Sequence, residues 1–473
     1  MKILFATSEA VPFIKSGGLA DVAGSLSKAL RGRRQACRVV MPLYEDIDTD
    51  LKADFKFISS FNVQLGWRSQ YCGVFEGTHA GVKYYFIDNE FYFKRRGIYG
   101  YFDEAERFAF FSKAVLEMLQ HIDFAPDIIH CHDWHTALVP IYLNSFYRDI
   151  SIYQNIKTVF TIHNIQYQGM FSENVGRDVA GLPESAMSSV KWADGVNLMK
   201  GALLESDALT TVSPTYAVEL QDQWYAHGLA SVLAENRHKL TGILNGIDYD
   251  VYNPAEDGKI FETFTASNLA GKSANKKELQ TILGLDQNED AMLVGMVTRL
   301  VGHKGMDMIQ WAFGWMMDKP VQFVLLGAGD WVYESFFRDM ADGFPGKVSI
   351  NLGFDDVLAR RIYAGCDALL MPSKAEPCGL SQMIAMRYGT IPIVRNTGGL
   401  KDSVNDLWGD GGNGYTFETF NVEDMKSAIT RAISDFSDSE KWQSHIKKAM
   451  KSDFSWGVSA HSYIELYKKL IEA

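Results

Sequence analysis

Short apolar runs alternate with amphipathic stretches along the first half of the chain. The runs have the length of buried strands, and segments 104–120 and 137–146 have the spacing of helices. This alternation is typical of an α/β fold with a doubly wound parallel sheet. The predicted strands cover residues 3–6, 39–41, 82–87, 127–130, 158–162, 208–212 and 243–244.

The alternation stops after Asn245 and begins again at Met292. The stretch between them is polar, and we expect it to be irregular as far as about Lys277. A chain of 473 residues also exceeds what one hydrophobic core usually supports. We therefore predict two α/β domains, residues 1–245 and 246–455.

The second domain repeats the pattern of the first. A last helix, over about 457–472, follows it and could pack on either domain. The predicted strands of this domain are 292–297, 321–326, 348–350, 368–371 and 391–394, and its helices begin at Met306, Trp331, Asp355 and Leu380.

Composition and charge exclude several classes of protein. The net charge of -12, without a dense basic patch, argues against binding to nucleic acid. No segment approaches the roughly 20 apolar residues that span a bilayer, and the first apolar run is too short for a signal peptide. The five cysteines are scattered, with no CxxC pair, so neither a disulfide framework nor a zinc ribbon is expected. We expect a soluble protein of the reducing cytoplasm.

Two Gly-Gly pairs each stand between an apolar run and a predicted helix. Gly17-Gly18 follows Lys15, and Gly398-Gly399 occupies the corresponding place in the second domain. Glycines there let backbone N–H groups approach an anion, which the helix dipole also favours. The alternative is that each pair only permits a tight turn.

A dense polar cluster, His130 to His135, lies at the end of a predicted buried strand and contains Asp133. Its spacing allows a metal site, although no second cluster supplies the remaining ligands, and we favour a hydrogen-bond network. His163 is in the same position on the next strand, as a functional residue or as a satisfied polar one.

In the second domain, Arg299 and Lys304 follow a strand and could flank a phosphate group, or form a solvated basic turn. Glu376 lies between a strand and a helix, where it could face a ligand or cap the helix. We expect the backbone N–H groups of Gly379 and Leu380 to point outward at that helix start.

These motifs occur in one order over essentially the whole chain, and together they resemble the bacterial glycogen synthase and plant starch synthase family. The motifs that carry the resemblance are Lys15 to Val22, His130 to His135, Thr161 to Asn164, Asn245 to Asp248, Arg299 to Gly305 and Glu376 to Leu380. The resemblance implies a GT-B architecture, in which two Rossmann-like domains face each other across a deep cleft and helix 456–473 returns to the first domain.

The resemblance also implies an activity, the metal-independent transfer of glucose from ADP-glucose to the non-reducing end of an α-1,4-glucan. The anomeric configuration is retained, and no cofactor is needed. The first domain would be on the glucan side, and the second would bind the nucleotide sugar.

The implied roles can be assigned to individual residues. Lys15, Gly17 and Gly18 would line the donor and phosphate region, with Cys378, Gly379 and Leu380. Arg299 and Lys304 would neutralise the departing diphosphate. Glu376 would hold glucose hydroxyls, and His163, Asp133 and Asn245 would shape the sugar pocket.

The chain departs from the family pattern at several places. Ser16 and His303 replace a usual threonine and glutamine, Gly228 to Leu233 lacks an expected acidic residue and glycine, and Arg31 to Cys37 replaces a usual Gly-His turn. A related transferase that uses UDP-glucose or another acceptor, a non-catalytic glucan-binding homologue and a metal-dependent hydrolase are the alternatives. Neither the oligomeric state nor the allosteric effectors nor the preferred glucan length follows from the sequence.

Overall fold

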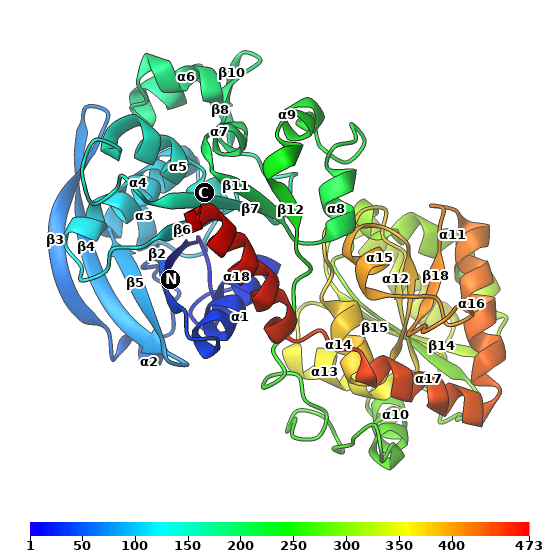
Figure 1. Cartoon of the computed structure of the whole chain (residues 1–473). Coiled ribbons are helices and arrows are strands. Elements are labelled where there is room, and N and C mark those ends of the chain that lie inside the picture. The colour runs from blue at the N-terminus through cyan, green and yellow to red at the C-terminus, as the bar shows by residue number, and fades with distance from the viewer. Residues whose placement is uncertain (473) are drawn as a thin grey trace. The chain divides into compact units, whose positions relative to one another are not determined.

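The computed structural model describes residues 1–472, which form two compact units (Figure 1). Unit 1 contains Met1–Asn245 together with the last helix, α18 (Trp456–Glu472), and unit 2 contains Gly246–Ser455. Within residues 1–472, no helix has both the length and the apolar character needed to cross a membrane.

Unit 1 is built on a nine-stranded sheet with the order β12-β11-β7-β6-β1-β2-β5-β4-β3. The seven strands from β12 to β5 are parallel and confirm the predicted doubly wound sheet. The hairpin β3–β4 extends it with antiparallel strands that the pattern did not predict. The strands are β1 (Lys2–Ala6), β2 (Ala36–Pro42), β3 (Lys56–Leu65), β4 (Arg68–His79), β5 (Val82–Asp88), β6 (Ile128–His132), β7 (Lys157–Ile162), β11 (Ala208–Thr211) and β12 (Leu240–Gly242).

The remaining elements of unit 1 are short or cover the sheet. A small second sheet contains β8 (Met170–Ser172), β10 (Gly195–Asn197) and β9 (Lys191–Trp192). The helices are α1 (Gly18–Gly32), α2 (Thr49–Lys52), α3 (Glu90–Phe93), α4 (Glu104–Glu117), α5 (Leu138–Tyr142), α6 (Glu184–Val190), α7 (Leu198–Glu205), α8 (Pro214–Glu219) and α9 (Ala230–Glu235), with shorter turns η1 (Met118–Gln120), η2 (Trp134–Thr136), η3 (Leu143–Tyr147), η4 (Val175–Val179) and η5 (Arg237–Lys239).

Unit 2 has a six-stranded parallel sheet with the order β15-β14-β13-β16-β17-β18, which confirms the second predicted α/β domain fold. The strands are β13 (Met292–Val297), β14 (Val321–Gly327), β15 (Val348–Leu352), β16 (Ala368–Met371), β17 (Ile391–Arg395) and β18 (Tyr415–Phe417). The helices are α10 (Ala270–Ile282), α11 (Met306–Met317), α12 (Trp331–Gly343), α13 (Asp356–Gly365), α14 (Ser381–Arg387), α15 (Gly398–Ser403), α16 (Val422–Phe436) and α17 (Ser439–Lys451), with the turn η6 (Gly302–Lys304).

Two predictions of local structure are wrong. The strand predicted at residues 243–244 ends earlier, because β12 pairs with β11 only over Leu240–Gly242. The stretch predicted to be irregular contains most of α10. This helix was hidden because its buried face is polar: the Lys272 ammonium donates hydrogen bonds to main-chain carbonyls at 3.0 to 3.1 Å, which a hydrophobic pattern cannot reveal.

The atypical turn between α1 and β2 has a backbone conformation that favours glycine. Arg34 has φ of 64°, in the left-handed region that a Cβ atom disfavours. A residue with a side chain therefore occupies this position at a backbone cost. The neighbouring Arg33 donates a hydrogen bond of 2.7 Å to the carbonyl of Gly457 and so attaches the turn to α18. In the other atypical segment, Gly228 has φ of 95° and precedes α9.

Helix α18 packs against α1 and contributes buried tyrosines to unit 1; Figure 1 shows the two helices beside each other. The hydroxyl of Tyr467 lies 2.7 Å from Nδ1 of His130, in the middle of β6, and Ser459 donates to the carbonyl of Leu244, after β12, at 2.6 Å. The last helix therefore stabilises the carboxyl end of the central sheet.

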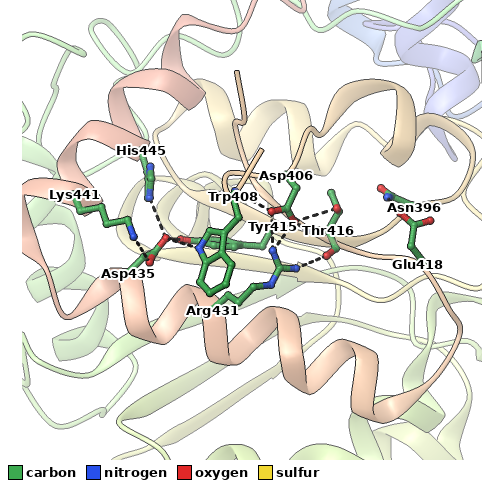
Figure 2. A network of polar contacts seen from close by, with 10 residues as sticks. All are labelled: Asn396, Asp406, Trp408, Tyr415, Thr416, Glu418, Arg431, Asp435, Lys441 and His445. Carbon is green, nitrogen blue, oxygen red and sulfur yellow. Dashed lines mark hydrogen bonds and ion pairs between the residues drawn. The ribbon is translucent and has the colours of Figure 1, made fainter. Parts of the chain in front are cut away.

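A buried carboxylate in unit 2 joins helices α16 and α17 to β18 (Figure 2). Asp435, which is 2% exposed, accepts hydrogen bonds from Lys441, Tyr415 and Trp408 at 2.6, 2.8 and 3.1 Å, and His445 Nε2 lies 3.2 Å away. Burial disfavours the charged form, but the hydrogen bonds outweigh it and lower the pKa of Asp435 below 3.8.

We expect Asp435→Asn to reduce the free energy of unfolding of unit 2 by about 2 kcal/mol at pH 7, since charge-assisted hydrogen bonds are lost. A carboxyl group whose pKa is lower in the folded state than in the unfolded state stabilises the fold at pH above its unfolded pKa. This stabilisation is lost as the pH falls through the folded-state pKa. The difference between variant and wild type should therefore shrink below pH 3.8. Calorimetric melting of both proteins between pH 7 and pH 3 measures this difference in the free energy of unfolding. The exposed Glu440→Gln is the control, with an expected change below about 1 kcal/mol; an equal effect of both substitutions would contradict the prediction.

Candidate active site

The predicted site residues lie at the carboxyl ends of strands, around the point in each sheet where the strand order reverses. In unit 1 this point is between β1 and β6, and in unit 2 it is between β13 and β16. Open α/β sheets bind ligands at such switch points, because loops from adjacent strands diverge there. Each unit therefore carries a candidate site of its own.

The loop after β1 leads to Gly17, which precedes α1 and provides no side-chain cap for that helix. Lys15 lies before it and forms an ion pair of 2.8 Å with Asp21 in the first helical turn. Glu9 holds the loop in place, because its buried carboxylate accepts a hydrogen bond of 2.5 Å from the Ser16 N–H. Burial raises the pKa of Glu9, and the N–H groups of Ser16 and Gly17 oppose that rise.

Glycine occupies the two Gly-Gly pairs for different structural reasons. A Cβ atom on Gly399 would lie 2.2 Å from the carbonyl oxygen of Cys378, so close packing requires that glycine. A Cβ atom on Gly18 would meet nothing within 4 Å, and one on Gly17 would meet only Glu9, at 3.9 Å. Packing explains Gly399, and Gly398 has φ of 46°, in the left-handed region that favours glycine. Around the first pair, the space at the start of α1 is open, so a ligand could approach the backbone there.

At the end of β6, Asp133 adopts φ of 55°, an unusual conformation for a residue with a side chain. Its Oδ1 accepts the main-chain N–H groups of His163 at 2.7 Å and Asn164 at 3.4 Å. Burial raises the pKa of Asp133 to about 7; the backbone hydrogen bonds oppose this, and the nearby charge of Glu9 adds to it. The structure thus brings the glycine loop, Asp133 and His163 into one electrostatic environment.

The other histidines of this region form a hydrogen-bond network. His130 bonds the Tyr467 hydroxyl and, at 2.6 Å, the Thr161 hydroxyl, while His132 Nδ1 lies 3.0 Å from His163 Nε2. Burial lowers the pKa of His163 and of His130 to about 3. Residues 1–472 contain no group of three or more His, Cys, Asp and Glu side chains placed to hold a metal ion.

In unit 2, the ammonium of Lys304 donates hydrogen bonds to both carboxylate oxygens of Glu376, at 2.7 and 2.6 Å. Ser373 donates a third, at 2.9 Å, to the same carboxylate. The two charged side chains are only 17% and 7% exposed. The alternative that Glu376 caps the next helix is wrong, because α14 has no side-chain cap.

The other predicted residues of unit 2 surround this pair. Arg299 is exposed, and its guanidinium bonds to no other side chain or carbonyl among residues 1–472. Burial, together with the positive charges of Lys304 and Arg299, lowers the pKa of His303 to about 4. Cys378 is buried, and Gly379 has φ of 73°.

The backbone N–H groups of Gly379 and Leu380 donate to no acceptor in the described part of the chain. In unit 1, Asn245 is buried at the end of the unit, and no described contact joins it to Asp133 or His163.

Sequence reasoning missed two residues of the site in unit 1, Glu9 and Tyr99, and gave His132 no role of its own within the cluster His130 to His135. The Tyr99 hydroxyl bonds Ser8 at 2.7 Å, and its ring stacks on His135 at 4.7 Å. Glu9 could have been found, because it lies only three residues after the first predicted strand. Tyr99 could not, because it belongs to a loop distant in sequence from both β1 and β6.

Comparisons with known proteins place the whole chain among characterised relatives. Residues 2–235 match the family described as "Starch synthase catalytic domain", and residues 281–449 match "Glycosyl transferases group 1". The glycogen synthase of Geobacillus thermodenitrificans is 48% identical over 477 residues, which cover 100% of this chain and 98% of that protein. The glycogen synthase of Bacillus cereus (strain ATCC 10987) is also 48% identical, with complete coverage of both chains.

A solved structure is similar over its full length. It is the catalytic domain of starch synthase IV from Arabidopsis thaliana, bound to ADP and acarbose, with a TM-score of 0.93 and 36% identity. The match covers 100% of this chain and 99% of that chain.

We expect the two glycine pairs to respond differently to an added methyl group. Gly399→Ala should lower the free energy of unfolding by about 2 kcal/mol through overpacking against Cys378. Gly18→Ala, in open space at a helix start, should change it by less than about 1 kcal/mol and not unfavourably. Thermal melting of both variants beside the wild type measures this. A large loss of stability in Gly18→Ala would show that packing also explains the first pair.

Proposed function

Because the chain belongs to the family of bacterial glycogen synthases and plant starch synthases, we propose that it transfers glucose from ADP-glucose to the non-reducing end of an α-1,4-glucan. The chain is a glycosyltransferase of glucan synthesis with two Rossmann-like domains of the GT-B type. ADP in the starch synthase IV structure supports an adenine nucleotide as the leaving group, and acarbose supports a glucan-like acceptor.

The Lys304–Glu376 pair is the observation that carries the proposal. A lysine and a glutamate that are largely withdrawn from water stabilise each other only while both are charged. Departure of ADP adds negative charge to a phosphate oxygen, and an ammonium in this position can transfer hydrogen bonds from the carboxylate to that oxygen. The carboxylate then retains acceptor capacity for sugar hydroxyls. One pair therefore provides a contact for the leaving group and a contact for glucose.

Unit 1 contains groups of its own that suit an anionic sugar donor. The open space above Gly17 and Gly18 lets the N–H groups at the start of α1 approach the diphosphate, and Lys15 lies beside it. Asp133 and His163 are joined by a hydrogen bond, and we assign them to the sugar and to the region of its anomeric carbon.

In unit 2, Arg299 is exposed and free of acceptors among residues 1–472, and it provides a second cation for the diphosphate.

The chemical step breaks the bond between C1 of glucose and the phosphate oxygen and forms a bond from C1 to the 4-hydroxyl oxygen of the glucan. The electron pair of the broken bond leaves with ADP, where Lys304 and Arg299 stabilise it. Attack from the same face retains the anomeric configuration and lets the departing phosphate oxygen accept the hydroxyl proton. No carboxylate nucleophile is assigned, so the two-carboxylate scheme of glycosidases does not apply.

The direct test is an assay of purified protein with glycogen and either ADP-glucose or UDP-glucose, each with and without EDTA. We expect release of ADP and growth of the glucan, unchanged by the chelator. Faster turnover with UDP-glucose would favour the alternative donor, and loss of activity in EDTA would favour metal-dependent chemistry. Binding of glycogen without turnover of either donor would identify a non-catalytic homologue.

We expect Lys304→Ala to lower kcat by about 100- to 1,000-fold, the cost of removing one contact to developing negative charge. Binding to glycogen, measured by co-sedimentation, should change little because the ammonium contacts the leaving group. Lys447→Ala, an exposed lysine of α17, is the matched control and should retain wild-type kcat. Melting curves show whether Lys304→Ala stays folded; equal losses of kcat and glycogen affinity in the folded variant would contradict this role.

A further inference from the structure

A buried histidine lies behind His163 and has not been given a role. His132, at the end of β6, is 0% exposed, and its Nδ1 lies 3.0 Å from Nε2 of His163 at the end of β7. The Nε2 atom of His132 is buried, and no group of residues 1–472 lies within hydrogen-bond distance of it. His163 is therefore the one hydrogen-bond partner of the His132 ring within residues 1–472.

Both rings are neutral near pH 7, since burial lowers the pKa of His163 to about 3 and that of His132 well below 6.5. The His130 ring stacks on the His132 ring at 4.3 Å and also disfavours the protonated form of His132. A neutral imidazole carries one N–H, so only one of the two facing nitrogens can hold the shared hydrogen.

Two arrangements are possible. If His163 donates through Nε2, the hydrogen of His132 must be on its own Nε2, which leaves a buried N–H without an acceptor. If His132 donates through Nδ1, its Nε2 is a bare acceptor and no buried N–H of His132 is left unpaired, while the hydrogen of His163 is on Nδ1 of a ring that is only half-buried. Orphaned N–H groups are the rarer of the two in protein interiors, and an unmade hydrogen bond costs the desolvation of the donor. The second arrangement is therefore favoured.

We propose that His132 is a positioning residue for the reaction: it donates from Nδ1 to Nε2 of His163 and holds His163 in the tautomer that carries hydrogen on Nδ1. The His163 ring can then act toward a ligand only as a donor through Nδ1. This atom has no partner among residues 1–472, and the ring is half-buried rather than enclosed. The catalytic consequence rests on the proposed function of His163, but the tautomer does not.

The surroundings of His132 suit a fixed orientation. Phe5 of the adjacent strand contacts the His132 ring at 5.0 Å and the His130 ring at 4.9 Å. His130 is held in turn by Tyr467 and Thr161. The ring of His132 thus has neighbours on several sides and cannot turn away from His163 without disturbing the core.

The first test is the tautomer of His163 in the wild-type protein. Long-range ¹⁵N–¹H correlation spectra of ¹⁵N-histidine-labelled protein at pH 7.5 distinguish Nδ1–H from Nε2–H rings, and the His163 signals are assigned by their loss in His163→Asn. We expect His163 to carry hydrogen on Nδ1. A spectrum with hydrogen on Nε2 would overturn the proposal, whatever the activity of the protein.

The second test replaces the donor. His132→Leu removes it, so His163 should lose the fixed tautomer, and kcat should fall by about tenfold while KM for ADP-glucose changes little. His132→Asn places an amide N–H near the position of Nδ1 and should restore both the tautomer and most of kcat. Tyr467→Phe, which removes a partner of His130 but not of His132, is the matched control and should leave the His163 tautomer unchanged.

The outcomes separate the two claims. An Nδ1–H tautomer in a protein without transferase activity would support the positioning and contradict the proposed function. If His132→Leu does not fold, the wild-type spectrum and His132→Asn still decide the matter. A folded His132→Leu protein with an unchanged tautomer, or a His132→Asn protein with no recovery, would overturn the proposal.

Discussion

Two strand pairings determine where the polar residues of this protein meet. In unit 1, β1 pairs in parallel with β6, which follows it by more than a hundred residues, and in unit 2, β13 pairs in parallel with β16. Parallel pairing brings the carboxyl ends of both strands to the same edge of the sheet. The glycine loop and Asp133 depend on the first pairing, and the Lys304–Glu376 ion pair depends on the second.

These contacts matter for stability because the charged groups that make them are buried. A carboxylate or ammonium that is withdrawn from water stabilises the fold only if it is paired or accepts several hydrogen bonds. Asp133 and Glu376 meet this condition with N–H or ammonium donors from another strand end, and Glu9 meets it with the Ser16 N–H of its own loop. The same contacts that stabilise the sheets therefore orient the groups that we assign to the donor sugar and its diphosphate.

The glycine pairs show how similar sequence can serve different purposes. Gly399 is required because a side chain would collide with Cys378, whereas Gly18 has open space around its Cα atom. Equivalent positions in a motif thus need separate physical explanations. Arg34 is the converse case, since a residue with a side chain occupies a backbone conformation that glycine adopts at lower cost.

The sequence by itself determined the two α/β folds, the strand ends that carry polar residues and, through six ordered motifs, the family. These features depend on local periodicity and on short motifs, which are visible in one dimension. The tertiary structure alone decided that Lys304 pairs with Glu376, 72 residues away, and that His132 meets His163, 31 residues away. It also decided that the polar segment around Lys272 is helical and that the β3–β4 hairpin extends the sheet. The physical reason is that hydrogen bonds between distant side chains depend on which strands become neighbours, and strand order leaves no periodic signal in the chain.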